Sequence, residues 1–98
     1  MTYQVLASIF GNSVQVKLIE FFLVNNEGLF QLTDIAKHLQ ISHSRVHDLI
    51  DQLVQKRLVF ETRSQRNRLF ELNNNHPITK QLKELFKVVR AYNLASES

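Results

Sequence analysis

Two clusters of polar and cationic side chains have the residue types and spacing that could support chemistry. In residues 42–48, hydroxyl, imidazole and guanidinium groups follow one another as Ser42, His43, Ser44, Arg45 and His47. Residues 56–68 hold five cations, Lys56, Arg57, Arg63, Arg66 and Arg68, relieved only by Glu61. Hydroxyl and guanidinium groups donate hydrogen bonds to phosphate and carboxylate oxygens. Both clusters therefore predict an anionic partner.

The charge of the whole chain points the same way. The formal net charge is +3, but residues 1–55 carry three basic and five acidic residues, whereas residues 56–98 carry nine basic and four acidic residues. A basic half of this kind favours an anionic partner, with nucleic acid first. An ordinary solvated surface is the alternative.

The first cluster lies at the start of the second of two predicted helices. Thr33 can cap the first helix, and Ser42 can cap the second, which ends near Arg57. Apolar residues recur at the helical period and should face inward: Ile35, Ala36 and Leu39, then Val46, Leu49, Ile50, Leu53 and Val54. The link Gln40-Ile41 leaves room for only a tight bend. Residues 33–57 therefore predict a helix-turn-helix, and the residues left facing outward are Ser44, Arg45, His47 and Asp48.

The second cluster lies on a predicted β-hairpin. Residues 58–62 and 68–72 are rich in strand-forming side chains, and the basic segment 63–67 separates them. Because this loop contains no glycine, we expect it to be longer than a two-residue primed turn. Residues 29–32 predict a brief third strand, so the hairpin 58–72 would belong to a small sheet.

Helices should flank this unit on both sides. Residues 1–25 predict two N-terminal helices that meet at Gly11, and residues 77–92 predict a C-terminal helix with a continuous apolar stripe. The fold class expected for the single domain 1–98 is mainly α with a small β-sheet (α+β). Because both flanks carry more apolar surface than one small domain needs, we predict a homodimer. Its interface would contain Tyr3, Leu6, Phe10, Leu82, Leu85, Phe86 and Val89. The alternative is a last helix that folds back onto its own chain.

Other classes of protein find little support. The two glycines form no phosphate loop, cysteine is absent, and the serines fall at caps or in polar turns, so we expect neither an enzyme nor a cofactor. The most apolar window, residues 14–24, is about half the ~20 residues that a membrane span requires. We therefore expect a cytoplasmic protein without a membrane partner.

The spacing of His43, His47 and Asp51 along one helical face could in principle hold a divalent metal. The segment lacks the glutamate of a zinc-protease helix. We favour DNA contact or simple exposure for these histidines and predict no metal site.

The order of these elements resembles the winged helix-turn-helix transcription regulators, in particular the small MarR-like and ArsR-like proteins of archaea and bacteria. The resemblance covers residues 11–72 and rests on Ala36, Ile41, Val46, Leu49 and on Leu53 leading into Leu58-Val59-Phe60-Glu61. It implies a recognition helix that begins after Ser42 and lies in the major groove of double-stranded DNA, with a wing on phosphates or the minor groove. Arg45 would bond guanine, Ser42 and Ser44 would bond phosphate, and His43 or His47 could reach either. Arg63, Arg66 and Arg68 would follow the backbone.

Three residues depart from the family pattern. Gln40 stands where the turn usually has glycine, Arg57 replaces a frequent glycine before the hairpin, and Asp48 occupies a position that is commonly basic. An aspartate repels phosphate but can accept a hydrogen bond from cytosine. The runner-up hypothesis is a winged-helix module that binds an acidic protein surface. The operator, the direction of regulation and any small-molecule effector stay open.

Overall fold

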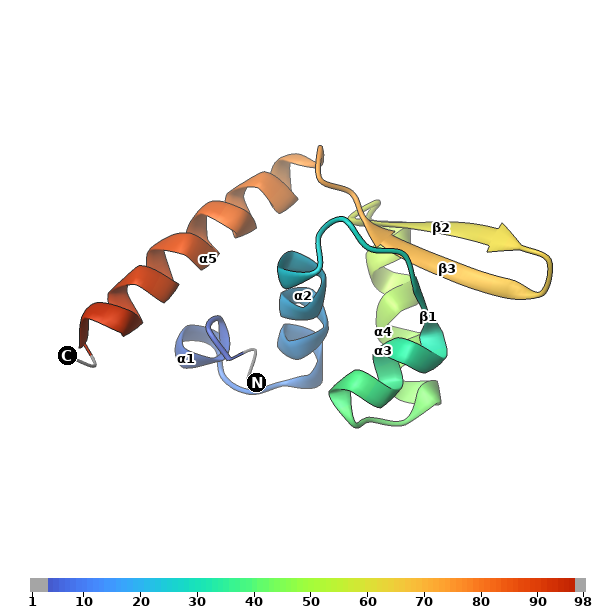
Figure 1. Cartoon of the computed structure of the whole chain (residues 1–98), viewed down its shortest axis with the longest axis horizontal. Coiled ribbons are helices and arrows are strands. Elements are labelled where there is room, and N and C mark those ends of the chain that lie inside the picture. The colour runs from blue at the N-terminus through green and yellow to red at the C-terminus, as the bar shows by residue number, and fades with distance from the viewer. Residues whose placement is uncertain (1–3, 97–98) are drawn as a thin grey trace.

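The structure is a computed structural model that describes residues 4–96. Its elements are α1 (Ala7–Phe10), α2 (Val14–Val24), β1 (Phe30–Gln31), α3 (Leu32–Leu39), α4 (His43–Gln55), β2 (Val59–Ser64), β3 (Asn67–Leu72) and α5 (Pro77–Ser96). The β2–β3 hairpin projects from one end of the molecule, while α1 and α5 lie at the other end, with α2 between them (Figure 1). This arrangement confirms the predicted fold class, a mainly helical winged helix with a small sheet. None of the helices described is both long and apolar enough to cross a bilayer.

The helix-turn-helix forms from α3 and α4 much as the apolar period predicts. Ser42 caps α4, because its hydroxyl oxygen accepts a hydrogen bond from the Arg45 backbone N–H at 3.3 Å. The predicted cap at Thr33 is wrong. Gln31 precedes the first turn of α3, and the Asp34 carboxylate reaches back to the Gln31 N–H at 3.4 Å. Gln31 and Asp34 thus form a capping box, and α3 begins at Leu32, which was predicted to belong to a strand.

Two positions where glycine was expected adopt left-handed backbone. Gln40 ends α3 with φ 58°, and Arg57 precedes β2 with φ 64°. Non-glycine residues pay a steric cost in this region, and the surrounding packing must hold them there. The tight bend predicted at residues 40–41 is thus formed without glycine.

The sheet is antiparallel, and its strand order is β1-β3-β2. Phe30 pairs with Phe70 and Val59 pairs with Leu72. Ser64 pairs with Asn67, so only Gln65 and Arg66 connect the two strands of the hairpin. The prediction of a longer loop is wrong, because Gln65 supplies the left-handed turn residue with φ 59°.

A single core joins the helices to the inner face of the sheet. Its most deeply buried side chains come from α2, α3, α4, β2 and β3 and include Leu18, Phe22, Ile35, Val46, Ile50, Val59 and Phe70. The inward residues predicted for both helices of the helix-turn-helix are buried or half-buried. The core therefore fixes which side of α4 is left for solvent.

A buried carboxylate anchors the N-terminal segment. Glu20 on α2 accepts hydrogen bonds from the backbone N–H groups of Val5 and Leu6 at 2.8 and 2.7 Å. These bonds hold Val5 and Leu6 against α2 just before α1 begins at Ala7, so the predicted helix starts later than its apolar spacing suggested. Tyr3 lies outside the described residues.

Helix α5 runs from the base of the hairpin to the opposite end of the molecule (Figure 1), where Asn93 in its C-terminal half donates a hydrogen bond to the Ser8 hydroxyl of α1 at 3.2 Å. The helix extends to Ser96, beyond the predicted end at residue 92. Its inward side packs on the core, but α1 and α5 together expose Ile9, Phe10, Val88, Tyr92 and Leu94.

The first turn of α5 brings a polar group into an apolar site. A cavity of about 10 Å³ is bordered by Phe22, Leu53, Leu58, Thr79 and Leu82, among others. Thr79 is fully buried, and its hydroxyl has no hydrogen-bond partner among the described residues. An unpaired buried hydroxyl disfavours the folded state by its lost hydration.

We therefore expect Thr79→Val to raise the free energy of unfolding by about 1–2 kcal/mol, because valine has the same shape without the hydroxyl. Chemical denaturation at one fixed protein concentration measures this change. Thr33→Val, at an exposed helical position, is the matched control and should have little effect. A loss of stability in Thr79→Val would show that the hydroxyl is paired in solution.

Candidate nucleic-acid interface

The start of α4 presents the first polar cluster to solvent. Val46 and Ile50 are fully buried, and this turns Ser44, Arg45 and His47 outward, as predicted. Ser42 and His43 are also exposed at the N-terminus of the helix. An exposed helix N-terminus bears free N–H groups and a partial positive charge, so this end of α4 can bind a phosphate.

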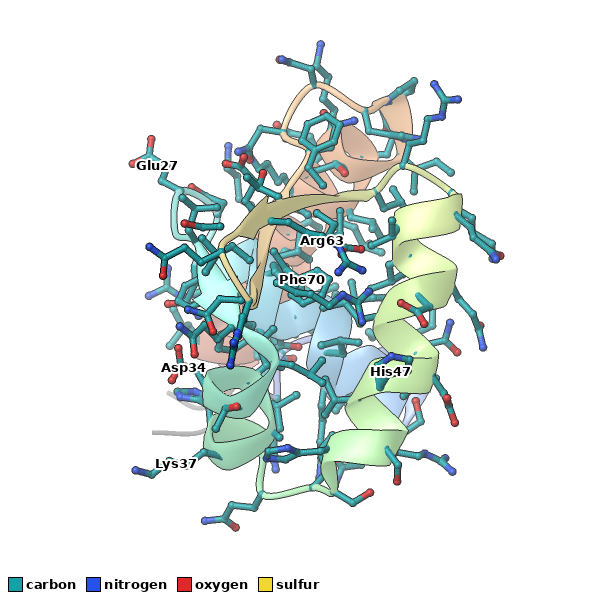
Figure 2. All side chains as sticks on the ribbon, turned by 90° about the vertical axis from the view of Figure 1, so that its right-hand side faces the viewer. Glu27, Asp34, Lys37, His47, Arg63 and Phe70 are labelled. Carbon is teal, nitrogen blue, oxygen red and sulfur yellow. The ribbon has the colours of Figure 1, made fainter. Side chains whose placement is uncertain are left out.

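The hairpin brings further cations to the same side of the molecule. Arg66 is exposed in the two-residue loop, and Arg63 on β2 is exposed with its Nε 3.4 Å from the Glu61 carboxylate. Figure 2 looks directly onto this end and shows Arg63 between the hairpin and α4, with His47 on α4 below it. Arg63 on the hairpin and His47 on α4 thus face the same end of the molecule (Figure 2), whereas Lys56 and Arg57 follow the C-terminal end of α4.

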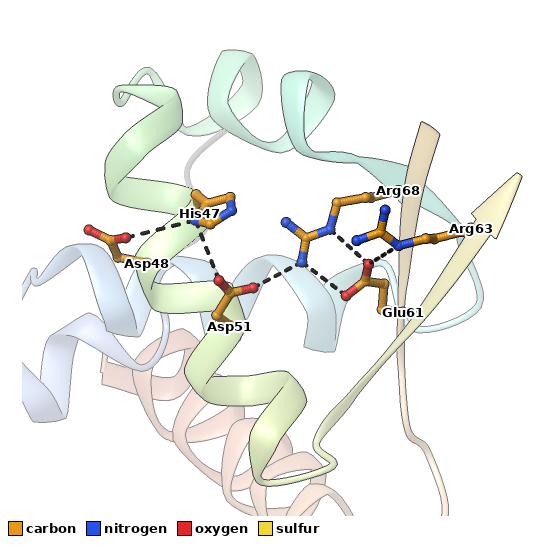
Figure 3. A network of polar contacts seen from close by, with 6 residues as sticks. All are labelled: His47, Asp48, Asp51, Glu61, Arg63 and Arg68. Atoms are coloured by element: carbon orange, nitrogen blue, oxygen red, sulfur yellow. Dashed lines mark hydrogen bonds and ion pairs between the residues drawn. The ribbon is translucent and has the colours of Figure 1, made fainter. Parts of the chain in front are cut away.

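Arg68 is placed differently from the other predicted contact residues. Its guanidinium turns toward α4 and bonds Glu61 through Nε and Nη2 at 2.8 and 2.9 Å, and Asp51 through Nη2 at 2.9 Å (Figure 3). It also lies over the Phe70 ring, 5.0 Å from the centroid. With these contacts its Nε and Nη2 donors are directed toward Glu61 and Asp51.

This ion-pair network perturbs the groups that form it. The hydrogen bond from Arg68 lowers the pKa of Glu61, assisted by the charges of Arg68 and Arg63 and opposed by partial burial. The hydrogen bonds to Glu61 and then to Asp51 raise the pKa of Arg68. The side chains of Glu61 and Arg68 are only 19% and 23% exposed, so the pairs are less screened than those on an open surface.

The network continues along α4 to the proposed recognition surface. His47 Nδ1 lies 3.4 Å from Asp51 and 3.8 Å from Asp48 (Figure 3). The sequence pattern drew attention to Asp51 only as part of a metal hypothesis. Among residues 4–96 no group of three His, Cys, Asp or Glu side chains is arranged to hold a metal ion.

Sequence analysis gave no role to Glu61 and Asp51 in this network. Strand alternation places Glu61, Arg63 and Arg68 on one face of the hairpin, so the contact of Glu61 with the two arginines could have been predicted from the sequence. The approach of that face to Asp51 depends on how the hairpin packs on α4. No short-range pattern encodes that packing.

The predicted interface residues of the flanking helices divide into two groups. Leu6 and Val89 are 2% and 6% exposed within their own chain, and Leu82, Leu85 and Phe86 are half-buried against the core. Only Phe10 among the described members of that set is well exposed. The apolar side chains available to a second subunit are mostly others on the same two helices.

Comparison with known proteins supports the winged helix. The MarR family model matches residues 21–68, from the middle of α2 through the helix-turn-helix to the start of β3. Over these residues the chain is similar to the MarR family. Proteins of this family are winged-helix transcription regulators. No curated protein sequence matches the chain.

Solved structures of MarR-type regulators share the fold at low sequence identity. The chain is similar to MepR of Staphylococcus aureus in a DNA complex, with 21% identity, TM-score 0.67 and coverage of 96% of this chain and 76% of MepR. For the adhesin competence repressor AdcR of Streptococcus pyogenes the identity is 20%, the TM-score 0.65 and the coverage 94% and 67%. For the antimony-specific repressor AntR the identity is 17%, the TM-score is 0.68, and the match covers 96% of this chain and 79% of AntR.

The network predicts a pH-dependent contribution of Glu61 to stability. A carboxyl group whose pKa is lowered on folding stabilises the protein above its unfolded pKa, and this contribution is lost as pH falls through the folded pKa. Glu61→Gln should therefore lower the free energy of unfolding by about 1–3 kcal/mol near neutral pH. The difference should shrink once the pH falls below the ordinary value of 4.5.

Denaturation curves at a series of pH values measure the effect. Glu71→Gln, on the opposite face of the hairpin, is the matched control. A Glu61→Gln difference that stayed constant down to acid pH would contradict a role of the Glu61 charge in the network.

Proposed function

We propose that this chain is a double-stranded DNA-binding transcription regulator that acts as a homodimer. The observation that carries the proposal is the joint surface formed by the exposed N-terminus of α4 and the arginine-bearing hairpin of a MarR-family winged helix. The DNA complex of the similar protein MepR supports this use of the fold. The activity is binding without catalysis and needs no cofactor, and the chain would work in the cytoplasm.

The recognition helix α4 lies in the major groove in this proposal. Arg45 reaches base edges, where a guanidinium pairs with guanine O6 and N7. Ser42 and Ser44 bond phosphate at the helix N-terminus, and His43 and His47 contact bases or phosphates. Asp48 is the least favourable group on this face, since its side chain is 80% exposed and negatively charged. Its carboxylate would favour a base pair that presents a cytosine amino group, and it would repel nearby phosphates.

The hairpin acts as the wing. Arg63 and Arg66 bind phosphates or enter a narrow minor groove. Arg68 was expected to share this role, but its bonds to Glu61 and Asp51 fit a positioning residue that sets the angle between the wing and α4. Nε and Nη2 of Arg68 are already engaged by these three hydrogen bonds, so this guanidinium has fewer donors for DNA than those of Arg63 and Arg66.

Helices α1 and α5 supply the dimer interface. Their exposed apolar side chains lie on α1 and on the C-terminal half of α5, at the end of the molecule away from the wing (Figure 1), and are Ile9, Phe10, Val88, Tyr92 and Leu94. Tyr92 is 70% exposed in the single chain. Pairing these surfaces across a two-fold axis removes them from water and leaves both wings free.

Substitutions on the two parts of the surface should affect DNA binding differently. Arg66→Ala removes a phosphate contact, so it should weaken binding to all duplexes and reduce the salt dependence by about one unit of log slope. Arg45→Ala removes a contact to a base, so it should weaken binding to the best site by about 1–3 kcal/mol and thereby change the preference among duplexes. Site selection from random duplexes, followed by titration at several salt concentrations, measures both.

Lys80→Ala provides the control for charge, because Lys80 is exposed on α5. It should leave DNA affinity nearly unchanged. If Lys80→Ala weakened DNA binding as much as Arg66→Ala, the effect of Arg66→Ala would reflect only general electrostatic attraction. If neither Arg45→Ala nor Arg66→Ala changed binding, the proposed surface would be wrong.

Sedimentation at micromolar concentration tests the dimer. We expect a species of twice the chain mass of 11.5 kDa, and we expect Val88→Glu to shift it toward the single chain, because a charge would replace an apolar contact. Phe60→Glu, an exposed apolar position on the hairpin, is the matched control and should leave the dimer intact. A wild-type protein that sediments only at 11.5 kDa would overturn the dimer.

A further inference from the structure

Strand β2 forms one edge of the sheet. The strand order β1-β3-β2 leaves one side of β2 unpaired, and every second residue of an antiparallel edge strand directs its N–H and C=O groups outward. Among the described residues, no hydrogen bond engages the outward backbone groups of β2. Exposed strand edges of this kind are templates for pairing with another chain.

A groove lies along this edge. It has a volume of about 500 Å³ and is lined by Val54, Arg57, Val59, Phe60, Glu61 and Arg63. The lining comes from the C-terminal end of α4, from the turn that follows it and from β2, and no residue of β3 contributes. The groove therefore follows the unpaired side of β2.

The groove combines an apolar surface with cations. Phe60 is 46% exposed, although it is a large aromatic residue on a strand. Arg57 lines the groove just before β2, and Arg63 lines it near the end of that strand. Both side chains are exposed. Both carboxylate oxygens of Glu61 accept hydrogen bonds from Arg68, so the groove's own acid is already paired. The charge left for a partner is positive.

We propose that the β2 edge docks an extended acidic segment of a partner protein, which adds a fourth strand to the sheet. The partner segment supplies backbone hydrogen bonds to β2, one apolar side chain to Phe60 on one face of the strand and another to Val54 on the other face, and carboxylates to Arg57 and Arg63. Since β2 has six residues, the segment is about six residues long, or roughly 20 Å. Recognition by strand addition in this way obtains affinity from the backbone and specificity from alternate side chains.

Two other occupants fit the groove less well. A second copy of this chain would bring its own Arg57 and Arg63 against the same cations, and like charges disfavour pairing along an edge. A DNA backbone would satisfy the two arginines, but it offers no hydrogen-bond donors to the outward C=O groups and leaves Phe60 without an apolar partner. The mixture of strand edge, aromatic surface and cations favours an acidic peptide.

A synthetic peptide tests the docking surface directly. The probe is a blocked peptide of about eight residues with two glutamates at each end and alternating valine and threonine between them. Titrated into the full chain, it should bind in a saturable manner, shift the amide resonances of residues 59–64 and slow their hydrogen exchange. A peptide of the same sequence with a central proline loses a backbone donor and should bind more weakly.

Matched variants separate the groove from general charge attraction. Phe60→Ala should weaken peptide binding by about tenfold and leave duplex DNA binding unchanged. Arg57→Gly should also weaken the peptide, and glycine suits the left-handed backbone at φ 64°. Lys56→Ala, which removes a neighbouring cation that does not line the groove, should have a smaller effect.

Several results would overturn the proposal. No saturable binding, or amide shifts confined to the start of α4 and the loop at residues 65–66, would exclude docking at β2. Equal effects of Arg57→Gly and Lys56→Ala would leave only nonspecific attraction. A loss of DNA affinity in Phe60→Ala without a loss of peptide affinity would assign the groove to DNA. None of these results bears on the Arg45 and Arg66 experiments, so the DNA-binding proposal stands or fails separately.

Discussion

The guanidinium of Arg68 joins α4 to the hairpin, the two parts of the molecule on which the proposed DNA recognition depends. It holds Glu61 within the hairpin and Asp51 on α4 at the same time, so the wing is tied to the recognition helix by charge-assisted hydrogen bonds (Figure 3). A two-stranded hairpin that projects from a domain has little packing of its own to set its direction. The network supplies that constraint beside the buried Phe70, where the hairpin leaves the core, and so helps to set the geometry of the rest of the proposed surface.

The same network explains how acidic residues can lie beside a surface proposed to bind DNA. Asp51 and Glu61 would repel phosphates if they were free, but each is bonded to Arg68, and Arg63 also approaches Glu61. Their charge is used within the protein to orient the wing. Asp48 differs, because its contact is a distant one to His47, and its side chain is largely exposed. In the proposed complex, Asp48 is therefore the acidic residue with the most direct influence on which DNA sequence is read.

The molecule separates its surfaces by chemistry. Exposed apolar residues of α1 and α5 occupy one end, the cations of α4 and the hairpin occupy the other, and the free edge of β2 on the hairpin combines both characters (Figure 1). A dimer formed through the first surface would leave the second and third accessible. Docking at the β2 edge would bring an acidic segment beside Arg63, so the partner and DNA would compete for that cation.

The sequence by itself determined the helix-turn-helix, the cap at Ser42 and the outward position of Arg45 and His47. These features follow from helical periodicity and from contacts between residues a few positions apart, which a pattern can capture. The role of Arg68 was decided only by the tertiary structure, since Asp51 is 17 positions away and meets it only when the hairpin packs on α4. Burial of Leu6 and Val89 and the open edge of β2 were likewise decided by which elements pack together, because exposure depends on neighbours that are distant in the chain.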